Sequence, residues 1–302
     1  MWKGLVLITG ARGMVGRALV QNLGASAVSL GHAELDISDQ RAAAAALDRV
    51  DPEMLINCAA ATDVDRCETD HAYAEKANME GPRILAEVCA ARGIGFVHAS
   101  TDYVFDGNKV TAYVEGDRPN PVNYYGWSKL QGEEAVLTMA PDLPVCLIVR
   151  TSWVYGPGGA DAANFPARVL DWAGRSNRLR IACDQWGSPT FAPFLARGIM
   201  ELLATGAEGV YHLAGDGCAS RLEFAQEVIA ASRLDVVVEP AQAAEFAVPA
   251  PRPTRSCLDC SRAAALGVRL PSWKEGVASY VGALLGDRSA RADNGYSDPM
   301  TA

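Results

Sequence analysis

The feature of this sequence that most constrains its fold is a regular alternation of short apolar runs with longer stretches of helical periodicity. The apolar runs have the length and composition of strands, and they span residues 5–9, 27–30, 54–60, 95–100 and 145–156. Helices are predicted over residues 40–50, 71–93 and 124–140, and another begins within residues 10–16. Because the strands are apolar on both faces, we expect an α/β fold with a doubly wound parallel sheet between two layers of helices.

The composition of the chain changes after Gly156. Residues 157–190 are rich in Gly, Pro, Asn and Trp, which favours loops. Further on we predict helices over 191–205, 220–233 and 273–285, a strand over 209–215, an irregular segment over 240–256 and a disordered polar tail over 287–302. These patterns predict a first domain over 1–156, completed by 191–215, and a smaller, discontinuous, loop-rich lobe within 157–286.

Three glycines, Gly10, Gly13 and Gly16, lie between the first strand and the first helix in the pattern GxxGxxG. Glycine allows a tight turn and a close approach of the backbone to a ligand, and a helix N-terminus attracts phosphate. This spacing differs from the more common GxGxxG, and glycine-rich turns also serve packing. Its position in the first strand–helix unit predicts a dinucleotide-binding domain of the Rossmann type.

The choice between NADPH and NADH depends on the end of the second strand, where an acidic residue binds the ribose hydroxyls of NAD. This sequence has Ser29-Leu30-Gly31-His32 there, without an acid. Arg12 in the glycine loop could contact a 2′-phosphate, so we favour NADPH over NADH. The alternative is that Arg12 is simply an exposed surface residue. Asp36 and Ile37 are placed to flank the adenine, although an aspartate at 36 or 39 also suits a helix N-cap.

Tyr125 and Lys129 are four residues apart on a predicted helix and therefore share one face. A phenol with a pKa of about 10 is a poor acid–base catalyst near neutral pH, and an adjacent ammonium would lower that pKa. A YxxxK pair is common by chance. Here it follows a strand that ends at Ser100-Thr101, with a dinucleotide loop upstream, so we predict a proton-transfer site in which Thr101 hydrogen-bonds the reacting oxygen.

These features resemble the extended short-chain dehydrogenase/reductase superfamily. Longer blocks are more specific, and they resemble the dTDP-4-dehydrorhamnose reductase family over about residues 3–285. The blocks are STDYVFDG (100–107), NPVNYYGWSKLQGE (120–133), RTSWVYGPGG (150–159), NF (164–165), DQWGSPT (184–190) and RPTRSCLD (252–259). The resemblance implies reduction of the C4 ketone of dTDP-4-dehydro-L-rhamnose by NAD(P)H.

The same resemblance assigns roles to residues. Tyr125 would donate a proton to the C4 oxygen, Lys129 would bind the nicotinamide ribose and tune Tyr125, and Thr101 would complete the triad. The expected cofactor contacts are Gly10, Arg12, Gly13, Met14, Val15, Gly16, Asp36, Ile37, Ala60, Ala61, Thr62, Ala99, Tyr125 and Lys129. The expected substrate contacts are Val64, Thr101, Asp102 and Trp153, with Asn164, Phe165 and Arg252 on the nucleotide side. An aromatic ring such as Trp153 packs well on a sugar, and it is equally suited to a hydrophobic core.

Three other functions stay open. The first is a sugar-nucleotide dehydratase or epimerase. In dehydratases of this superfamily an Asp-Glu pair follows the threonine, whereas here Thr101-Asp102 is followed by Tyr103, which disfavours dehydration. A non-catalytic NADP-binding regulatory subunit, such as the methionine adenosyltransferase β subunit, resembles the same family, but Thr101, Tyr125 and Lys129 are all present here. A reductase of another nucleotide-linked 4-keto-6-deoxysugar would share these motifs.

Composition excludes some partners and locations. The net charge is −9, which disfavours binding to a nucleic acid polymer. No segment approaches the roughly 18 apolar residues of a membrane span, and the N-terminal apolar run is too short for a signal peptide, so we expect a cytoplasmic protein. Eight cysteines with a single CxxC (257 and 260) predict free thiols and no zinc site.

Metal and assembly follow from the resemblance. Some family members form dimers around Mg²⁺ held by glutamates, and one of those positions is Ala18 here. Alanine offers no oxygen ligand, so we expect no metal site and favour a monomer over a dimer.

Overall fold

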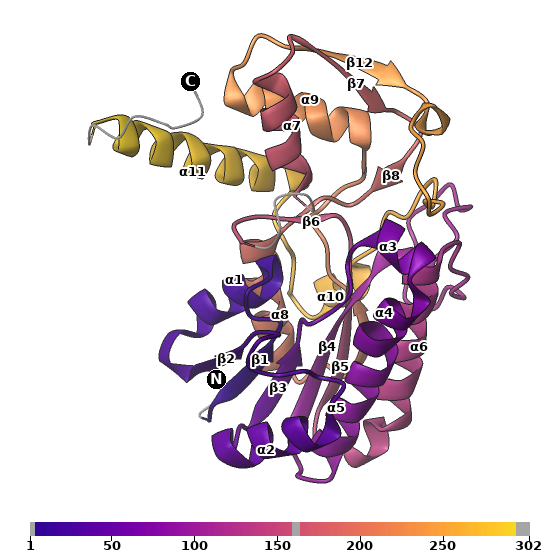
Figure 1. The fold of residues 1–302 in the computed structure, drawn as a ribbon, viewed down its shortest axis with the longest axis vertical. Helices are drawn as coiled ribbons and strands as arrows, with labels where there is room; N and C mark the ends of the chain where they lie inside the picture. The colour runs from indigo at the N-terminus through magenta and orange to yellow at the C-terminus, as the bar shows by residue number, and fades with distance from the viewer. Residues whose placement is uncertain (1–3, 159–163, 294–302) are drawn as a thin grey trace.

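The computed structural model describes residues 4–158 and 164–293 of the 302-residue chain, with backbone alone over 287–293. Figure 1 shows a larger part built around a parallel sheet and a smaller part packed against one end of that sheet. No helix among the described residues is both long enough and apolar enough to span a membrane.

The central sheet has six parallel strands in the spatial order β2-β1-β3-β4-β5-β10. The strands are β1 (Val6–Thr9), β2 (Ala27–Leu30), β3 (Met54–Asn57), β4 (Gly95–Thr101), β5 (Cys146–Thr151) and β10 (Gly209–His212). All side chains of β1, β3 and β5 are buried, as expected for strands covered on both faces. The predicted doubly wound α/β fold is therefore confirmed.

Helices cover the sheet on both sides (Figure 1). One hydrophobic core joins β1, β3 and β5 to α1 (Met14–Leu23) and α8 (Ala192–Ala204). A second core on the opposite face joins them to α2 (Gln40–Val50), α5 (Gly81–Ala90) and α6 (Tyr124–Thr138). This arrangement brings the carboxyl ends of the strands to one open edge, where parallel α/β sheets bind their ligands.

The predicted helix over residues 71–93 is interrupted by a wider π-helical turn. It consists of α4 (His71–Glu75), η2 (Lys76–Glu80) and α5. Asn78 in η2 accepts a hydrogen bond from Ala61 N (2.9 Å) and donates to Ala61 O (3.1 Å) and Ser128 Oγ (3.0 Å). This turn therefore fastens the segment after β3 to α6. A short helix, α3 (Val64–Thr69), was not predicted.

The smaller part contains more regular structure than expected. Residues 157–190 include α7 (Phe165–Ala173) and β7 (Arg178–Ala182), where we expected loops. β7 pairs in parallel with β12 (Val237–Ala241), and α9 (Arg221–Ser232) packs with them. The final helix, α11, runs over Trp273–Asp293 and therefore extends beyond the predicted helix over 273–285 into the segment where we expected a tail. The remainder of that expected tail, 294–302, lies outside the described residues.

Short strands connect the two parts. The predicted strand over 145–156 is divided into β5 and β6 (Val154–Tyr155), and β6 pairs with β9 (Thr190–Phe191) rather than with the central sheet. Trp153 lies at the break with a positive φ of 44°, a left-handed conformation that turns the chain there. β8 (Trp186–Gly187) pairs with β11 (Ala219–Ser220), just before α9.

One expectation about cysteines is wrong. Cys218 and Cys257 form a disulfide with their Cα atoms 5.6 Å apart, across 39 residues of sequence. The other six, Cys58, Cys67, Cys89, Cys146, Cys183 and Cys260, are free thiols. Sequence spacing drew attention to the CxxC of 257 and 260, but the fold brings Cys257 to a residue that precedes β11.

Candidate active site

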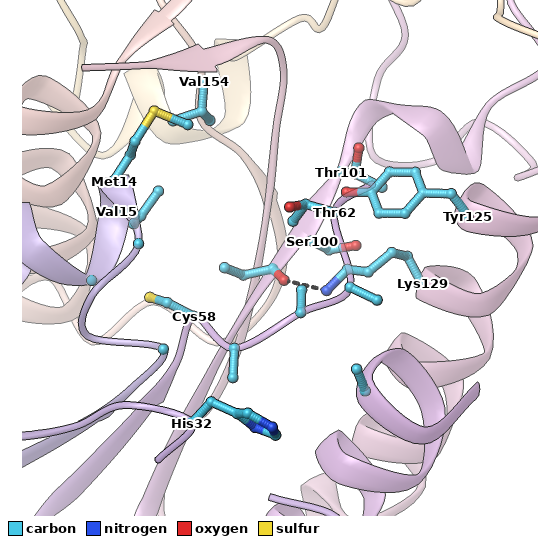
Figure 2. Close-up of a pocket in the computed structure, with 18 of the residues that line it drawn as sticks. Met14, Val15, His32, Cys58, Thr62, Ser100, Thr101, Tyr125, Lys129 and Val154 are labelled. Carbon is cyan, nitrogen blue, oxygen red and sulfur yellow. Dashed lines mark hydrogen bonds between the residues drawn. The ribbon is translucent and has the colours of Figure 1, made fainter. Parts of the chain in front are cut away.

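A cavity of about 960 Å³ lies at the carboxyl ends of the central strands, where the two parts of the chain meet (Figure 2). Its wall includes the glycine loop, the ends of β3, β4 and β5, the start of α6, and Arg221 at the start of α9. All fourteen expected cofactor residues line it: Gly10, Arg12, Gly13, Met14, Val15, Gly16, Asp36, Ile37, Ala60, Ala61, Thr62, Ala99, Tyr125 and Lys129. Val64, Thr101, Asp102 and Trp153 line it as well.

The glycine loop lies so close to neighbouring backbone that side chains would not fit. Gly10 has a φ of +65°, and a Cβ there would lie 2.5 Å from Ala59 N. A Cβ on Gly16 would lie 2.4 Å from Gly10 O. Gly13 is the N-cap of α1 and offers no side chain to cap it. The first-turn N–H groups of α1 are therefore available to an anion, and the loop fits the pyrophosphate of a dinucleotide.

Arg12 forms an ion pair with Glu34, and both side chains are largely exposed (73% and 41%). Glu34 also accepts a hydrogen bond from Gly31 N at 2.9 Å. The structure thus places the carboxylate of Glu34 near the end of β2, where no acid was expected from the sequence. The acid was missed because it comes four residues after Leu30, beyond a turn rather than at the strand end. Arg12 and Glu34 together do not distinguish NADPH from NADH.

Asp36 and Ile37 line the same end of the cavity. Asp36 forms an ion pair with Lys76 (2.8 Å), and this hydrogen bond, with others from Ser38, lowers the pKa of Asp36 to about 2. Asp39, not Asp36, is the N-cap of α2, since its side chain accepts from Arg41 N and Ala42 N. Lys76, on η2, is a cavity residue that the sequence analysis missed.

Tyr125 and Thr101 meet across the cavity wall. In Figure 2 the phenol of Tyr125, from α6, points toward Thr101, the last residue of β4. Burial raises the pKa of Tyr125 well above its ordinary value, and the Thr101 hydrogen bond only partly opposes this rise. Lys129 does not contribute to this shift, so the expected lowering of the pKa of Tyr125 by Lys129 stays a prediction. At neutral pH Tyr125 is protonated and can donate a proton.

Lys129 lies deeper in the wall and is 2% exposed. Its Nζ donates to Ala99 O at 2.7 Å, drawn in Figure 2, and lies 3.2 Å from His98 Nε2. Burial lowers the pKa of Lys129 to about 8, although Glu133 and Cys58 oppose this shift. The amine is therefore held against β4.

Asp102 connects three segments that are far apart in sequence. One carboxylate oxygen accepts from Thr101 (3.2 Å), and the other accepts from Ser152 (2.9 Å) and Ser256. Burial raises the pKa of Asp102 to about 6, and these hydroxyls reduce the rise. Asp102 thus holds together the end of β4, the end of β5 and the loop that precedes α10 (Ser261–Ala265).

Arg221 and Thr151 are among the other cavity residues that were not predicted. The Arg221 guanidinium lies 3.5 Å from the ring centroid of Trp153, which places a cation on the substrate side of the cavity. Thr151, at the end of β5, has a buried Oγ1 with no hydrogen-bond partner in the part of the chain that the structure describes. Arg221 is the first residue of α9 and lies within the capping box Ser220–Glu223, a helix-start pattern that reveals the helix but not its distance from the cavity.

Three expected substrate residues lie outside the cavity lining. Asn164 is buried and donates to Gly156 O (2.8 Å) and Tyr280 Oη (2.9 Å). Phe165 packs on Phe224 with ring centroids 5.1 Å apart. Arg252 forms a two-pronged ion pair with Asp65 on α3, at 2.7 and 2.9 Å. Their side chains are thus used to fasten the loops around the cavity.

Comparison with known proteins agrees with this site. The sequence matches the family model described as the RmlD substrate binding domain over residues 4–285. The chain belongs to this family. The dTDP-4-dehydrorhamnose reductase of Mycolicibacterium smegmatis is 37% identical over 93% of this chain and 86% of that protein. A probable dTDP-4,6-dihydroxy-2-methyloxan-3-one 4-ketoreductase of Streptomyces antibioticus is 39% identical over 89% and 91%.

A solved structure supports the family assignment. The dTDP-4-dehydrorhamnose reductase of Bacillus anthracis in complex with NADP superposes with a TM-score of 0.87, at 32% identity, over 92% of this chain and 99% of that one. This member of the RmlD family has a Rossmann-like fold. Its cavity lies at the carboxyl ends of the parallel strands, where Rossmann folds bind a dinucleotide. Among the described residues, no group of three or more His, Cys, Asp or Glu side chains could hold a metal ion.

Proposed function

We propose that this protein uses NAD(P)H to reduce the C4 ketone of dTDP-4-dehydro-L-rhamnose to dTDP-L-rhamnose. The observation that carries this proposal is the meeting of a protonated Tyr125 with Thr101 inside the cavity. The glycine loop, Trp153 and Arg221 line the same cavity as this pair. A ketone bound beside Tyr125 would have the phenol of Tyr125 as a proton donor to its carbonyl oxygen.

Each group then has a separate role in the reduction. The reduced nicotinamide supplies the hydride when it is bound. Tyr125 donates its proton to the developing alkoxide, because its raised pKa keeps the phenol protonated before the reaction. In this structure the Thr101 hydroxyl donates its one proton to Asp102. It would orient the same substrate oxygen by turning that proton away from Asp102.

The substrate side of the cavity suits a nucleotide-linked sugar. Trp153 offers an aromatic face to the sugar, and Arg221 offers a charge-assisted hydrogen bond to a diphosphate. Val64 and Asp102 complete this side. For Asn164, Phe165 and Arg252 we propose a supporting part, in which they hold the loops that carry these contacts.

For the cofactor we favour NADPH, with NADH also accepted. Arg12 is exposed enough to leave Glu34 and meet a 2′-phosphate, and Glu34 is placed to accept hydrogen bonds from ribose hydroxyls. We further propose a cytoplasmic monomer that needs no Mg²⁺ and binds neither a nucleic acid polymer nor a membrane. Light scattering with and without EDTA tests this. A dimer that dissociates on chelation would contradict it.

The function is tested by turnover of purified protein with NADPH and dTDP-4-dehydro-L-rhamnose. We expect loss of the reduced-nicotinamide absorbance and formation of dTDP-L-rhamnose. Turnover only with a different nucleotide-linked 4-keto-6-deoxysugar would support the alternative that the Streptomyces antibioticus relative suggests. Tight NADPH binding without turnover of any such ketone would instead favour a non-catalytic regulatory subunit.

A further inference from the structure

A row of buried polar side chains crosses the central sheet and ends at Lys129. Thr9, Asn57 and His98 are direct neighbours in the register of β1, β3 and β4. They are 1%, 0% and 0% exposed. Thr9 Oγ1 bonds Asn57 Oδ1 at 2.7 Å, Asn57 Nδ2 lies 3.1 Å from His98 Nδ1, and His98 Nε2 lies 3.2 Å from Lys129 Nζ. Buried polar groups in the middle of a parallel sheet are costly unless they are satisfied, so the direction of each bond matters.

The backbone determines that direction. Ala59 N–H can only donate, and it donates to Asn57 Oδ1 at 3.1 Å. The amide of Asn57 is therefore oriented with its NH₂ group toward His98, where it donates to Nδ1. A neutral imidazole has one donor nitrogen and one acceptor nitrogen. Because Nδ1 accepts, the proton of His98 is on Nε2.

This tautomer has a consequence for Lys129. The Nε2–H group of His98 points at Nζ, and an ammonium has no lone pair to accept it. Only the uncharged amine can accept this hydrogen bond while it donates to Ala99 O. When Nζ carries three protons, the Nε2–H of His98 and the ammonium of Lys129 are two buried donors that face each other. The ammonium must then turn toward the cavity to find another acceptor.

We propose that Asn57 and His98 are positioning residues that make Lys129 a titrating group: Asn57 locks the Nε2–H tautomer of His98, which favours the uncharged amine of Lys129 over its ammonium. This inference rests on the proposed function and deepens it, because Lys129 lines the same cavity as Tyr125 and lies one helical turn from it on α6. Neither Asn57 nor His98 lines the cavity, so both act through Lys129.

The surrounding charges agree with this assignment. Burial lowers the pKa of Lys129 to about 8 and that of His98 well below its ordinary value. The groups facing Lys129 from other positions are Glu133 on α6 and Cys58 after β3, and both raise the pKa of Lys129. Glu133 is already paired with Arg150 on β5 at 2.6 Å. The preference for the uncharged amine therefore arises from burial and from His98, not from a nearby cation.

The experiment compares two substitutions that differ in bond direction. In Asn57→Asp the carboxylate still accepts from Thr9 and Ala59, but it also accepts from His98, which moves the imidazole proton to Nδ1. Nε2 then accepts from the Lys129 ammonium, so we expect the titration midpoint of Lys129 to rise by about 1 pH unit or more. In His98→Gln the side-chain carbonyl replaces Nδ1 and the NH₂ group replaces Nε2–H, so the midpoint should stay within about 0.3 units of the unmodified protein.

Both quantities can be read by NMR without turnover. Nitrogen-15 spectra of the four histidines, assigned with the His98→Gln protein, report the tautomer of His98. Carbon-13 spectra of labelled lysine, assigned with Lys129→Met, report the titration of Lys129. We expect the Nε2–H tautomer in the unmodified protein and Nδ1–H in Asn57→Asp. If the latter does not fold, the tautomer of the unmodified protein and the His98→Gln titration still decide the question.

Three results would overturn the proposal. These are an Nδ1–H or charged His98 in the unmodified protein near neutral pH, an unmoved Lys129 midpoint in folded Asn57→Asp, or equal shifts in Asn57→Asp and His98→Gln. Failure of the proposed function would show differently, as absent turnover with the tautomer and titration still as expected.

Discussion

The cofactor side and the substrate side of the cavity are built in different ways. On the cofactor side, backbone and small residues at strand ends form the wall, as at Gly10, Gly16 and Ala60. On the substrate side, long side chains from distant segments form it. Arg221 reaches Trp153 across 68 positions of sequence, as 221 − 153 = 68, and Asp102 is bonded to Ser256.

This difference explains what each side can tolerate. The cofactor side is formed by strands, helices and the turns between them, so its geometry is fixed by the sheet. It should therefore be most sensitive to substitutions that add atoms where the backbone is closely packed. The substrate side depends on individual ionic and hydrogen-bonded contacts between segments, so single side chains there can be changed without disturbing the sheet. Tyr125 and Thr101 lie between the two sides, where the cofactor and the substrate are expected to meet.

The largest expected effect is at that boundary. Tyr125→Phe keeps the ring and its packing but removes the proton donor, so kcat should fall by about 10²–10⁴-fold. Calorimetric binding of NADPH should change little, which separates loss of chemistry from loss of the site. A variant within about twofold of the unmodified enzyme would remove Tyr125 from the proposed role.

The substrate side should lose affinity for the sugar nucleotide alone. In Arg221→Met a charge-assisted contact worth about 1.5–3 kcal/mol is lost, which corresponds to a rise of about 10- to 150-fold in KM for the sugar nucleotide. The KM for NADPH should be unchanged. Arg197→Met is the matched control, because Arg197 also lies over a ring, that of Phe194, but does not line the cavity. Equal effects of the two substitutions would refute a specific role for Arg221.

The cofactor side should respond to steric change before any ligand is added. In Gly16→Ala the new Cβ would lie 2.4 Å from Gly10 O, and overpacking of this kind costs about 1–3 kcal/mol of unfolding free energy. The control is Gly13→Ala, where the nearest atom is 3.3 Å away. Denaturant unfolding should show a clear loss for the first and little for the second. Equal stabilities would mean that the loop is not packed as described.

The smallest expected effect is on cofactor choice at the exposed edge. Arg12→Ala should lower the ratio of kcat/KM for NADPH to that for NADH by about tenfold, because one exposed charged contact is removed. Glu34→Gln should raise the same ratio, because it frees Arg12 and removes a negative charge that repels a 2′-phosphate. No change in the ratio for either variant would place the 2′-position of the cofactor elsewhere.

The sequence predicted the regular elements that form the cofactor side, but not the contacts between segments that form the substrate side. Strand and helix periodicity located the sheet, the glycine loop and the helix that carries Tyr125 and Lys129. It could not locate Arg221 or Glu34, because each reaches its place through a turn whose direction has no periodic signal. The sequence pattern also left Asn164 and Arg252 as ligand candidates, whereas the structure shows them bonded to Tyr280 and Asp65.

Burial is the other quantity that sequence did not predict. The expectation that Lys129 lowers the pKa of Tyr125 considered only the spacing of the two residues on a helix. In the structure, burial raises the pKa of Tyr125 and lowers that of Lys129 to about 8. The depth of a side chain in a cavity depends on the whole fold, and a local pattern does not contain it.

The most direct test of the central claim, ketone reduction in this cavity, follows the hydrogen that is transferred. The protein is incubated with dTDP-4-dehydro-L-rhamnose and NADPH that carries two deuterium atoms at C4 of the nicotinamide ring. We expect dTDP-L-rhamnose with one deuterium at C4 of the sugar, measured by mass spectrometry and NMR, and no such product from Tyr125→Phe over the same time. An unlabelled product, deuterium at another carbon, or equal product from Tyr125→Phe would contradict it.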